Sequence, residues 1–348
     1  MRHWQGRTKR IVAVMSLGVF WLTPPTGWSR IELPPGTIDL TEFISSAPLI
    51  FRGVVVDVKV ERSKTQMIVP ADARFKVQRW YRGNGGSDAD VHYETGFHSP
   101  GHLCLDFQPG TYWLVFATEK DGHWEFVDDC YGAQPVSSVI ASALRGSGIV
   151  DRMEADLEAG LADPERRGRL VSLQALGGIK STASRPALHQ IIDRGDSVEK
   201  DWATYATLRS GDTTVLGRIR EMFLRGEQDV PACYLGWELS QLKDKSAIPG
   251  LIEIVKTVQN SCALVNAMTA LGRTMRASEA LPAIASHLAD VDAGVRFSAL
   301  NAMSAVTSQP QCTLPLEPRW TQDMVEPTIS QCLNWWNQTG TRMFAIPK

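Results

Sequence analysis

The chain has 348 residues, of which 43% are hydrophobic and 21% are charged. At roughly 150 residues per domain this length allows about two domains, and the composition is that of a globular protein rather than a disordered one. The formal net charge is −2, so no basic excess draws the chain electrostatically to nucleic acid. We therefore expect no nucleic-acid partner.

Residues 1–29 have the pattern of a secretory signal peptide. Four basic residues precede an apolar run from Ile11 to Leu22, and Pro24 and Pro25 follow it. The run is too short to span a bilayer, and a short anchoring N-terminus is the alternative. Removing the signal takes away four cations and no acids, which changes the net charge from −2 to −6. The sequence predicts a periplasmic or extracellular protein that has no membrane association after signal cleavage.

Residues 30–138 have the pattern of a small all-β barrel domain. A short helix is expected over 39–47, because Leu40, Phe43 and Ile44 share one helical face. Gly53 predicts a bend in the first strand, and short strands bent by glycine are typical of a closed or partly closed barrel. The predicted strands are rich in β-branched and aromatic residues and cover 49–60, 73–81, 91–95, 111–118 and 124–127.

Two segments of this domain carry a family resemblance. In residues 101–117 a Cys precedes a Phe, a Gly and an aromatic-rich strand, and in residues 126–136 a second Cys precedes small residues and a Pro. Over residues 38–138 the chain resembles the tissue inhibitor of metalloproteinases and netrin-like superfamily, in the short form found in bacterial exported proteins. The resemblance implies an OB-type barrel, a disulfide between Cys104 and Cys130, and protease inhibition as a candidate function.

The chain departs from the animal inhibitors of that superfamily at one decisive position. Those inhibitors act through a mature N-terminal Cys, whose amine and carbonyl chelate the zinc ion of the protease. This chain has no Cys before Cys104. Zinc chelation by that route does not transfer to it, and no inhibitory residue is assigned.

Residues 153–307 form a repeat array, which a linker over 139–152 joins to the barrel. An apolar anchor recurs at steps of 32, 31, 32 and 32 residues. Such self-similarity marks stacked helical units, none of which buries its apolar face alone. The pattern resembles HEAT-like repeats in their short bacterial form and lacks the tetratricopeptide and ankyrin signatures. The anchors are Leu176, Leu208, Leu239, Leu271 and Met303.

Prolines and glycines predict where the helices of each unit begin and end. Pro186, Pro249 and Pro282 each precede an apolar run, and we expect them in the first turn of a second helix, where the missing N–H costs little. Gly177 and Gly178 are expected in the loop between the two helices of the first unit.

The first and last units also match each other beyond their anchors. Asp163 and Arg169 lie 127 positions before Asp290 and Arg296, which is four steps of just under 32. Arg169 and the two other arginines near the start of the first unit, Arg166 and Arg167, are expected to form either a solvated face or ion pairs between repeats.

Residues 308–348 are expected to cap the array. Terminal units must cover the last apolar face, and sequence proximity favours a disulfide between Cys312 and Cys332 that would pin such a cap. Trp335 and Trp336 have two interpretations: they pack inside the cap, or they are candidate anchors for a protein partner.

All six cysteines lie after the predicted signal. An even number in an oxidising compartment predicts disulfides, although six cysteines allow 15 pairings. Cys233 and Cys262 fall near the starts of first helices in adjacent units, where a bridge and two buried free thiols are the alternatives.

Common catalytic motifs are absent from the sequence, which contains no His-Glu-x-x-His, Gly-x-Ser-x-Gly, phosphate-loop, Cys-x-x-Cys or EF-hand pattern. The barrel contains a group of histidines and acids that suits a metal in residue type, but these residues have the pattern of exposed loop side chains. We assign no catalytic, cofactor-binding or metal-binding residue and expect no cofactor. The group consists of His92, His98, His102, His123, Asp128 and Asp129.

The sequence as a whole predicts a multidomain protein with a small all-β OB-type barrel followed by an all-α HEAT-like solenoid. Because solenoids expose extended concave surfaces, the leading hypothesis is an exported, non-enzymatic scaffold that binds a protein partner through its solenoid and barrel surfaces. The alternative is a protease inhibitor that acts without N-terminal Cys chelation.

Overall fold

The computed structural model describes residues 38–61, 68–99, 102–103, 105–128, 130–226, 230–314 and 322–344. These residues form two compact units, one within 29–234 and the other within 235–348. The predicted signal peptide and Cys104 lie outside the described residues.

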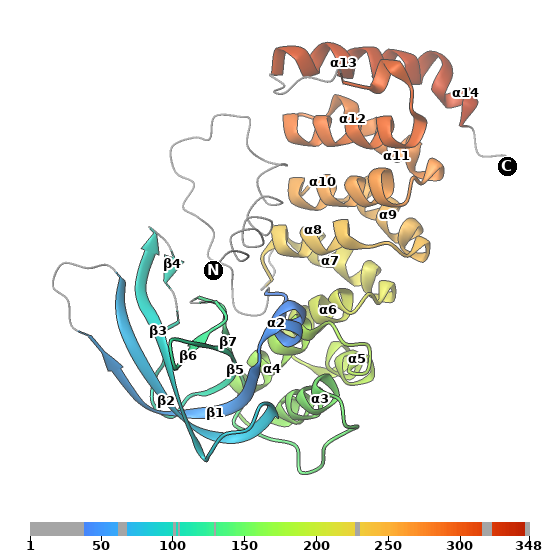
Figure 1. Cartoon of the computed structure of the whole chain (residues 1–348). Helices are drawn as coiled ribbons and strands as arrows, with labels where there is room; N and C mark the ends of the chain where they lie inside the picture. Colours follow the sequence, from blue (N-terminus) through green and yellow to red (C-terminus); the bar gives the residue numbers. More distant parts are fainter. Residues whose placement is uncertain are drawn as a thin grey trace. The chain divides into compact units, whose positions relative to one another are not determined.

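The first unit begins with a closed barrel (Figure 1). Antiparallel pairing joins β1 to β2, β2 to β3, β5 to β6 and β5 back to β1, whereas β3 and β6 pair in parallel. Five strands closed in this order have the OB topology, so the predicted fold class is confirmed. The elements are α2 (Leu40–Ser46), β1 (Leu49–Val60), β2 (Ile68–Arg82), β3 (Asp88–Ser99), β4 (His102–Leu103), β5 (Tyr112–Lys120), β6 (His123–Phe126) and β7 (Ala133–Pro135).

Aromatic side chains fill the barrel. Phe107 lies at the centre, with its ring centroid 5.4 Å from Phe75, 4.7 Å from Trp113 and 5.4 Å from Phe126. Such rings supply much of the apolar area that a small barrel buries. The register between β1 and β2 shifts at Gly53, which confirms the predicted irregularity in the first strand.

Tyr93 on β3 gives this core a pH dependence. Its ring contacts Phe107 and Phe126, and burial, with smaller contributions from Asp106 and Asp72, raises the pKa of its hydroxyl to about 12. The ordinary pKa of tyrosine is about 10, so between these values the unfolded chain releases a proton that the folded chain keeps.

Stability of the barrel should therefore fall as the pH rises from about 10 to about 12. Replacing Tyr93→Phe should make that part of the profile less steep, because phenylalanine has no proton to release, and the slope that remains comes from other buried tyrosines such as Tyr81. Denaturant unfolding of both proteins at several pH values across this window measures the effect. If the two proteins lose stability equally steeply, Tyr93 is not the titrating group.

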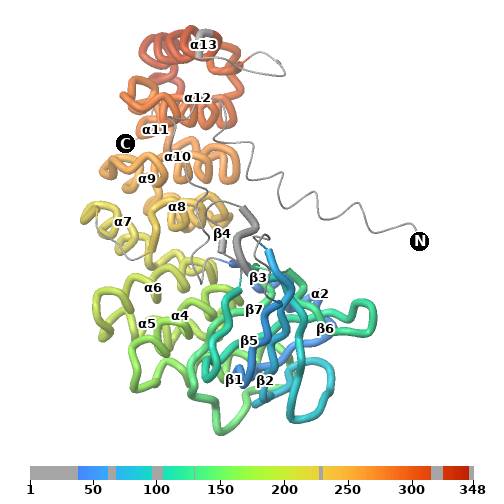
Figure 2. The backbone as a smooth tube through the Cα atoms, turned by 90° about the vertical axis from the view of Figure 1, so that its left-hand side faces the viewer, coloured from blue at the N-terminus to red at the C-terminus, as the bar shows by residue number. Residues whose placement is uncertain are grey.

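Helices follow the barrel, beginning with α3. First helices (α4, α6, α8, α10, α12) alternate with second helices (α5, α7, α9, α11), and the chain passes from one compact unit to the other within α8. Figure 2 shows α9 to α13 stacked in chain order within the second unit. The helices are α3 (Ile149–Ala159), α4 (Arg166–Ile179), α5 (Arg185–Arg194), α6 (Ser197–Arg209), α7 (Leu216–Arg225), α8 (Ala232–Gln241), α9 (Ile248–Thr257), α10 (Ser261–Thr269), α11 (Leu281–Ser286), α12 (Ala293–Thr307), α13 (Gln322–Trp335) and α14 (Thr341–Met343).

The repeat pattern of the sequence corresponds to these helix pairs. All five apolar anchors are buried in first helices or, for Leu271, in the π-helical turn that continues α10. Pro186, Pro249 and Pro282 stand in the first turns of α5, α9 and α11, as predicted. The predicted helical-repeat class is thus confirmed.

The prediction of a loop at Gly177 and Gly178 was wrong, because both residues lie within α4. A Cβ added at Gly178 would lie 2.8 Å from the side chain of Leu40 in α2, and one at Gly177 would lie 3.4 Å from Ala206 in α6. The glycines therefore allow close helix approach, and packing outweighs their low helix propensity.

A recurring arginine explains the long-range match between the first and last units. Arg169 donates to the carbonyl oxygens of Asp163 and Pro164 and pairs with Glu199 at 2.7 Å. At the equivalent place, Arg296 donates to the carbonyls of residues 290 and 291 and pairs with a glutamate, Glu326. Each arginine ties the turn before its own helix to a later helix, α6 for Arg169 and α13 for Arg296, so the predicted ion pairs between repeats are confirmed.

A buried polar network, which we call the junction, joins the barrel to α3. Arg52 on β1 is only 1% exposed. Its guanidinium donates to the carbonyl oxygens of Ser137 and Val139, and its Nε donates to Gln78 Oε1 at 3.0 Å. A charge buried this deeply is stable only with partners of this kind, so β1 is tied to the segment that leads into the helices.

Asp156 on α3, with 0% exposure, collects the other donors of the junction. Its carboxylate accepts from Arg79 Nη1 at 2.9 Å, from the Tyr81 hydroxyl at 2.5 Å and from the Ala141 N–H at 2.9 Å. Burial and the neighbouring Asp156 charge raise the pKa of Tyr81 far above its ordinary value, so the hydroxyl stays protonated and donates. The junction therefore fixes how the barrel sits on α3.

Candidate functional site

The candidate site is an open groove in the barrel, with about 430 Å³ of space. It lies over β2 and β3 and is bounded by the β2–β3 turn and the β5–β6 turn. Pockets of this size accommodate small ligands or single side chains of a macromolecule. The groove is lined by Leu49, Asp72, Trp80, Asn84, Gly85, Gly86, Asp88, Ala89, Asp90, His92, Gly122, His123 and Trp124.

Two half-buried indoles form the aromatic part of the groove. Trp80 lies near the end of β2. It packs against Phe51 of the core at 5.1 Å between ring centroids and donates its Nε1–H to the carbonyl oxygen of Gly86 at 3.3 Å. A Cβ added at Gly85 would lie 2.5 Å from the Trp80 ring, so only glycine lets the turn lie against this indole. Trp124 on β6 also packs on the barrel core.

Three carboxylates line the groove beside the indoles, because alternation on β2 and β3 directs Asp72, Asp88 and Asp90 outward. Asp72 Oδ1 lies 2.9 Å from His92 Nδ1, and Asp90 pairs with Arg74 at 2.8 Å. Asp88 accepts from the Ser87 hydroxyl at 2.6 Å. With neutral histidines the lining carries three negative charges. Two positive charges stand beside it on β2: Arg74, which pairs with Asp90, and Lys76, which lies opposite Asp88 in the strand register.

The histidine group noted in the sequence comes together only in part. His92 and His123 both line the groove, whereas Asp128 accepts from the backbone N–H groups of Cys130 and Tyr131. Within the part of the chain that the structure describes, no three His, Cys, Asp or Glu side chains are placed to hold a metal ion. The placement of Asp129 and of the His98 and His102 side chains lies outside that part.

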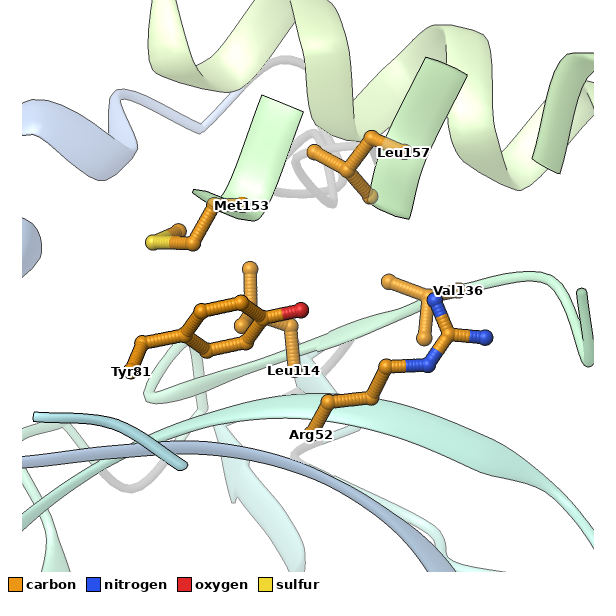
Figure 3. Close-up of a pocket in the computed structure, with 6 residues that line it drawn as sticks. All are labelled: Arg52, Tyr81, Leu114, Val136, Met153 and Leu157. Atoms are coloured by element: carbon orange, nitrogen blue, oxygen red, sulfur yellow. The ribbon is translucent and has the colours of Figure 1, made fainter. Parts of the chain in front are cut away.

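The space at the junction is not a ligand site. Figure 3 shows Arg52 and Tyr81 rising from the strands toward Met153 and Leu157 of α3, with Leu114 and Val136 beside them. The gap among these side chains is too small to hold a water molecule. Nη1 of Arg52 has no hydrogen-bond partner among the described residues. This polar cluster therefore serves packing and orientation.

The C-terminal segment contains a disulfide between Cys312 and Cys332, as sequence proximity predicts. Trp335 and Trp336 are 8% and 7% exposed, and their rings contact each other. This burial fits the capping interpretation and weighs against a role as exposed partner anchors.

The other described cysteines are oxidised as well. Cys130, Cys233 and Cys262 are each disulfide-bonded, and no described cysteine is free. Of the two alternatives for Cys233 and Cys262, the structure therefore contradicts the pair of free thiols.

Sequence reasoning did not identify the groove. Alternation predicts that Asp72 and Asp90 point outward, but only the register of β2 against β3, which places Asp72 opposite His92 and Arg74 opposite Asp90, brings them together. The glycine-rich turn over residues 83–86 has the composition of a simple hairpin turn, and its contact with Trp80 has no signal in the sequence.

Comparisons with known proteins give a partial structural match. No family model matches the sequence, and no curated protein matches it. A solved structure, the complex of CpcE and CpcF of phycocyanin lyase from Nostoc sp. PCC7120, is similar at 20% identity and a TM-score of 0.37, over 46% of this chain and 66% of that chain. The match thus spans just under two thirds of the length of its relative.

Among the described helices, none is both long enough and apolar enough to cross a membrane.

Proposed function

We propose that this chain is an exported, non-enzymatic scaffold that binds another protein through its barrel groove and the exposed faces of its helical repeats. The observation that carries the proposal is the groove, an open site with aromatic walls and polar groups on a domain that the junction holds rigidly against α3. Trp237 on α8, a large apolar side chain that is 41% exposed, supports contact through the repeats as well.

Disulfide usage supports the exported location. Cys130, Cys233, Cys262, Cys312 and Cys332 are all disulfide-bonded, and disulfides persist mainly outside the cytosol. The predicted signal peptide points the same way.

The proposal is tested with the chain from Arg30 onward as bait, cross-linked in the extracytoplasmic fraction of the source organism. We expect one protein to be enriched, with cross-links that map to the groove or to exposed helix faces. Enrichment of nothing above a denatured-bait control would contradict a scaffold role. An activity that copurifies with the chain and disappears with groove substitutions would contradict a non-enzymatic one.

A protease inhibitor related to the tissue inhibitors of metalloproteinases is the second candidate. The OB strand order and the disulfide at Cys130 support it, because an OB-type barrel with a disulfide at this place is what the resemblance to that superfamily implies. A panel of metalloproteases assayed with the intact chain tests it. Full protease activity at saturating chain would remove this candidate and leave the scaffold proposal standing.

A further inference from the structure

We propose that the barrel groove recognises a cationic side chain, lysine or arginine, on the surface of the protein partner. This inference rests on the proposed function and adds the chemistry of the partner to it. Three features of the groove carry the inference: its charge, its aromatic walls and its openness.

The charge of the groove favours a cation. Asp72, Asp88 and Asp90 line it together, with no Lys or Arg among the lining residues. Arg74, which pairs with Asp90, and Lys76, which lies opposite Asp88 in the strand register, stand beside the groove. Asp88 accepts from a neutral hydroxyl, that of Ser87, so its charge is not neutralised by that contact. Three carboxylates against these two cations leave the region net negative, so it would repel phosphate or carboxylate groups and attract an ammonium or guanidinium group.

The aromatic walls suit the same kind of group. Trp80 and Trp124 line the groove from the end of β2 and from β6, and both are only half-buried. Indole is the ring that attracts a cation most strongly over its face, and the apolar stem of lysine or arginine would pack beside it. Carboxylates next to indoles therefore match a long side chain that has an apolar stem and a charged end.

The openness of the groove points to a macromolecular ligand rather than an enclosed small one. About 430 Å³ of space exceeds the volume of one side chain, and the open mouth lets a side chain enter while its backbone stays outside. Because no described group of side chains is placed to hold a metal ion, a bare divalent cation is a poorer fit than an organic one.

The probe is a capped peptide, Gly-Gly-Lys-Gly-Gly, compared with its Arg and norleucine versions and followed by NMR on the indole N–H signals of Trp80 and Trp124 in the intact chain. We expect the Lys and Arg peptides to shift both signals with millimolar affinity and the norleucine peptide, which has a similar stem without charge, to leave them unmoved. Added salt should weaken binding. Equal shifts from norleucine, or none from any peptide, would overturn the inference.

Two variants test the residues. Asp88→Asn should weaken peptide binding about fivefold, whereas Asp193→Asn, which removes the same charge from the exposed surface of α5, should leave it unchanged. Gly85→Ala should also weaken binding, because the added Cβ displaces the Trp80 ring. If Asp88→Asn binds as tightly as the natural chain, the groove does not act through its charge.

The outcomes separate this inference from the proposed function. If both variants still bind a captured partner, the scaffold proposal stands, but the groove is not the site that recognises the partner. If the peptides bind but no partner is captured, the cation site is supported and the scaffold proposal is contradicted.

Discussion

Replacing Asp156→Ala will destabilise the barrel and α3 by about 3–5 kcal/mol, the usual effect of removing one partner from a buried charge pair. The substitution removes the carboxylate that accepts from both the partly buried Arg79 guanidinium and the buried Tyr81 hydroxyl. Hydrogen–deuterium exchange of β1, β2 and α3 peptides measures the change, and we expect all three to lose protection together.

The matched control is Lys120→Ala, which removes the surface ion pair between Lys120 and Glu125 on the same barrel. An exposed pair of this kind contributes at most about 1 kcal/mol. If Asp156→Ala changed exchange as little as Lys120→Ala, the junction would not hold the barrel on α3. Tyr81→Phe provides an intermediate step, since it removes one hydrogen bond and no charge.

Replacing Gly272→Ala will destabilise the second unit by about 1–3 kcal/mol through overpacking. Gly272 lies in the turn that continues α10, where an added Cβ would come within 2.5 Å of the Ala302 Cα and 2.6 Å of its Cβ in α12. Backbone atoms cannot move aside as a flexible side chain can, so the two helices must separate. Exchange of α10 and α12 peptides should increase.

Gly217→Ala is expected to have the opposite sign. Gly217 lies in α7, and nothing stands within 4 Å of an added Cβ. Alanine has the higher helix propensity, so protection of α7 should rise by up to about 1 kcal/mol. If the two substitutions had equal effects, helix propensity rather than interhelical contact would determine the stability change caused by Gly272→Ala.

The sequence predicts the elements of this fold well, because their signals are local. Alternation locates the strands, and a step near 32 residues locates the helix pairs with their prolines. The repeat also predicts the arginine that links one unit to the next, since Arg169 and Arg296 match at equivalent places. The prediction was wrong at Gly177 and Gly178, because the sequence alone does not distinguish a glycine that allows close helix packing from a glycine that ends a helix.

The junction and the groove could not be predicted, because their partners are distant in the chain. Asp156 accepts from Tyr81 and Arg79, which lie 75 and 77 positions away. Arg52, a charged residue within an apolar strand, is the one local feature that indicates a buried polar network, and it does not reveal which residues bind it. The groove likewise depends on strand register and on two turns that meet only after the barrel closes.

Repeat proteins change length by gaining or losing internal units, since each unit contacts only its neighbours. The junction limits where that can happen here. Arg79 and Tyr81 bind one particular carboxylate on α3, so a unit duplicated between the barrel and α3 would part them. Lengthening of the array is therefore confined to positions after α3, and the barrel is inherited together with the helix on which it sits.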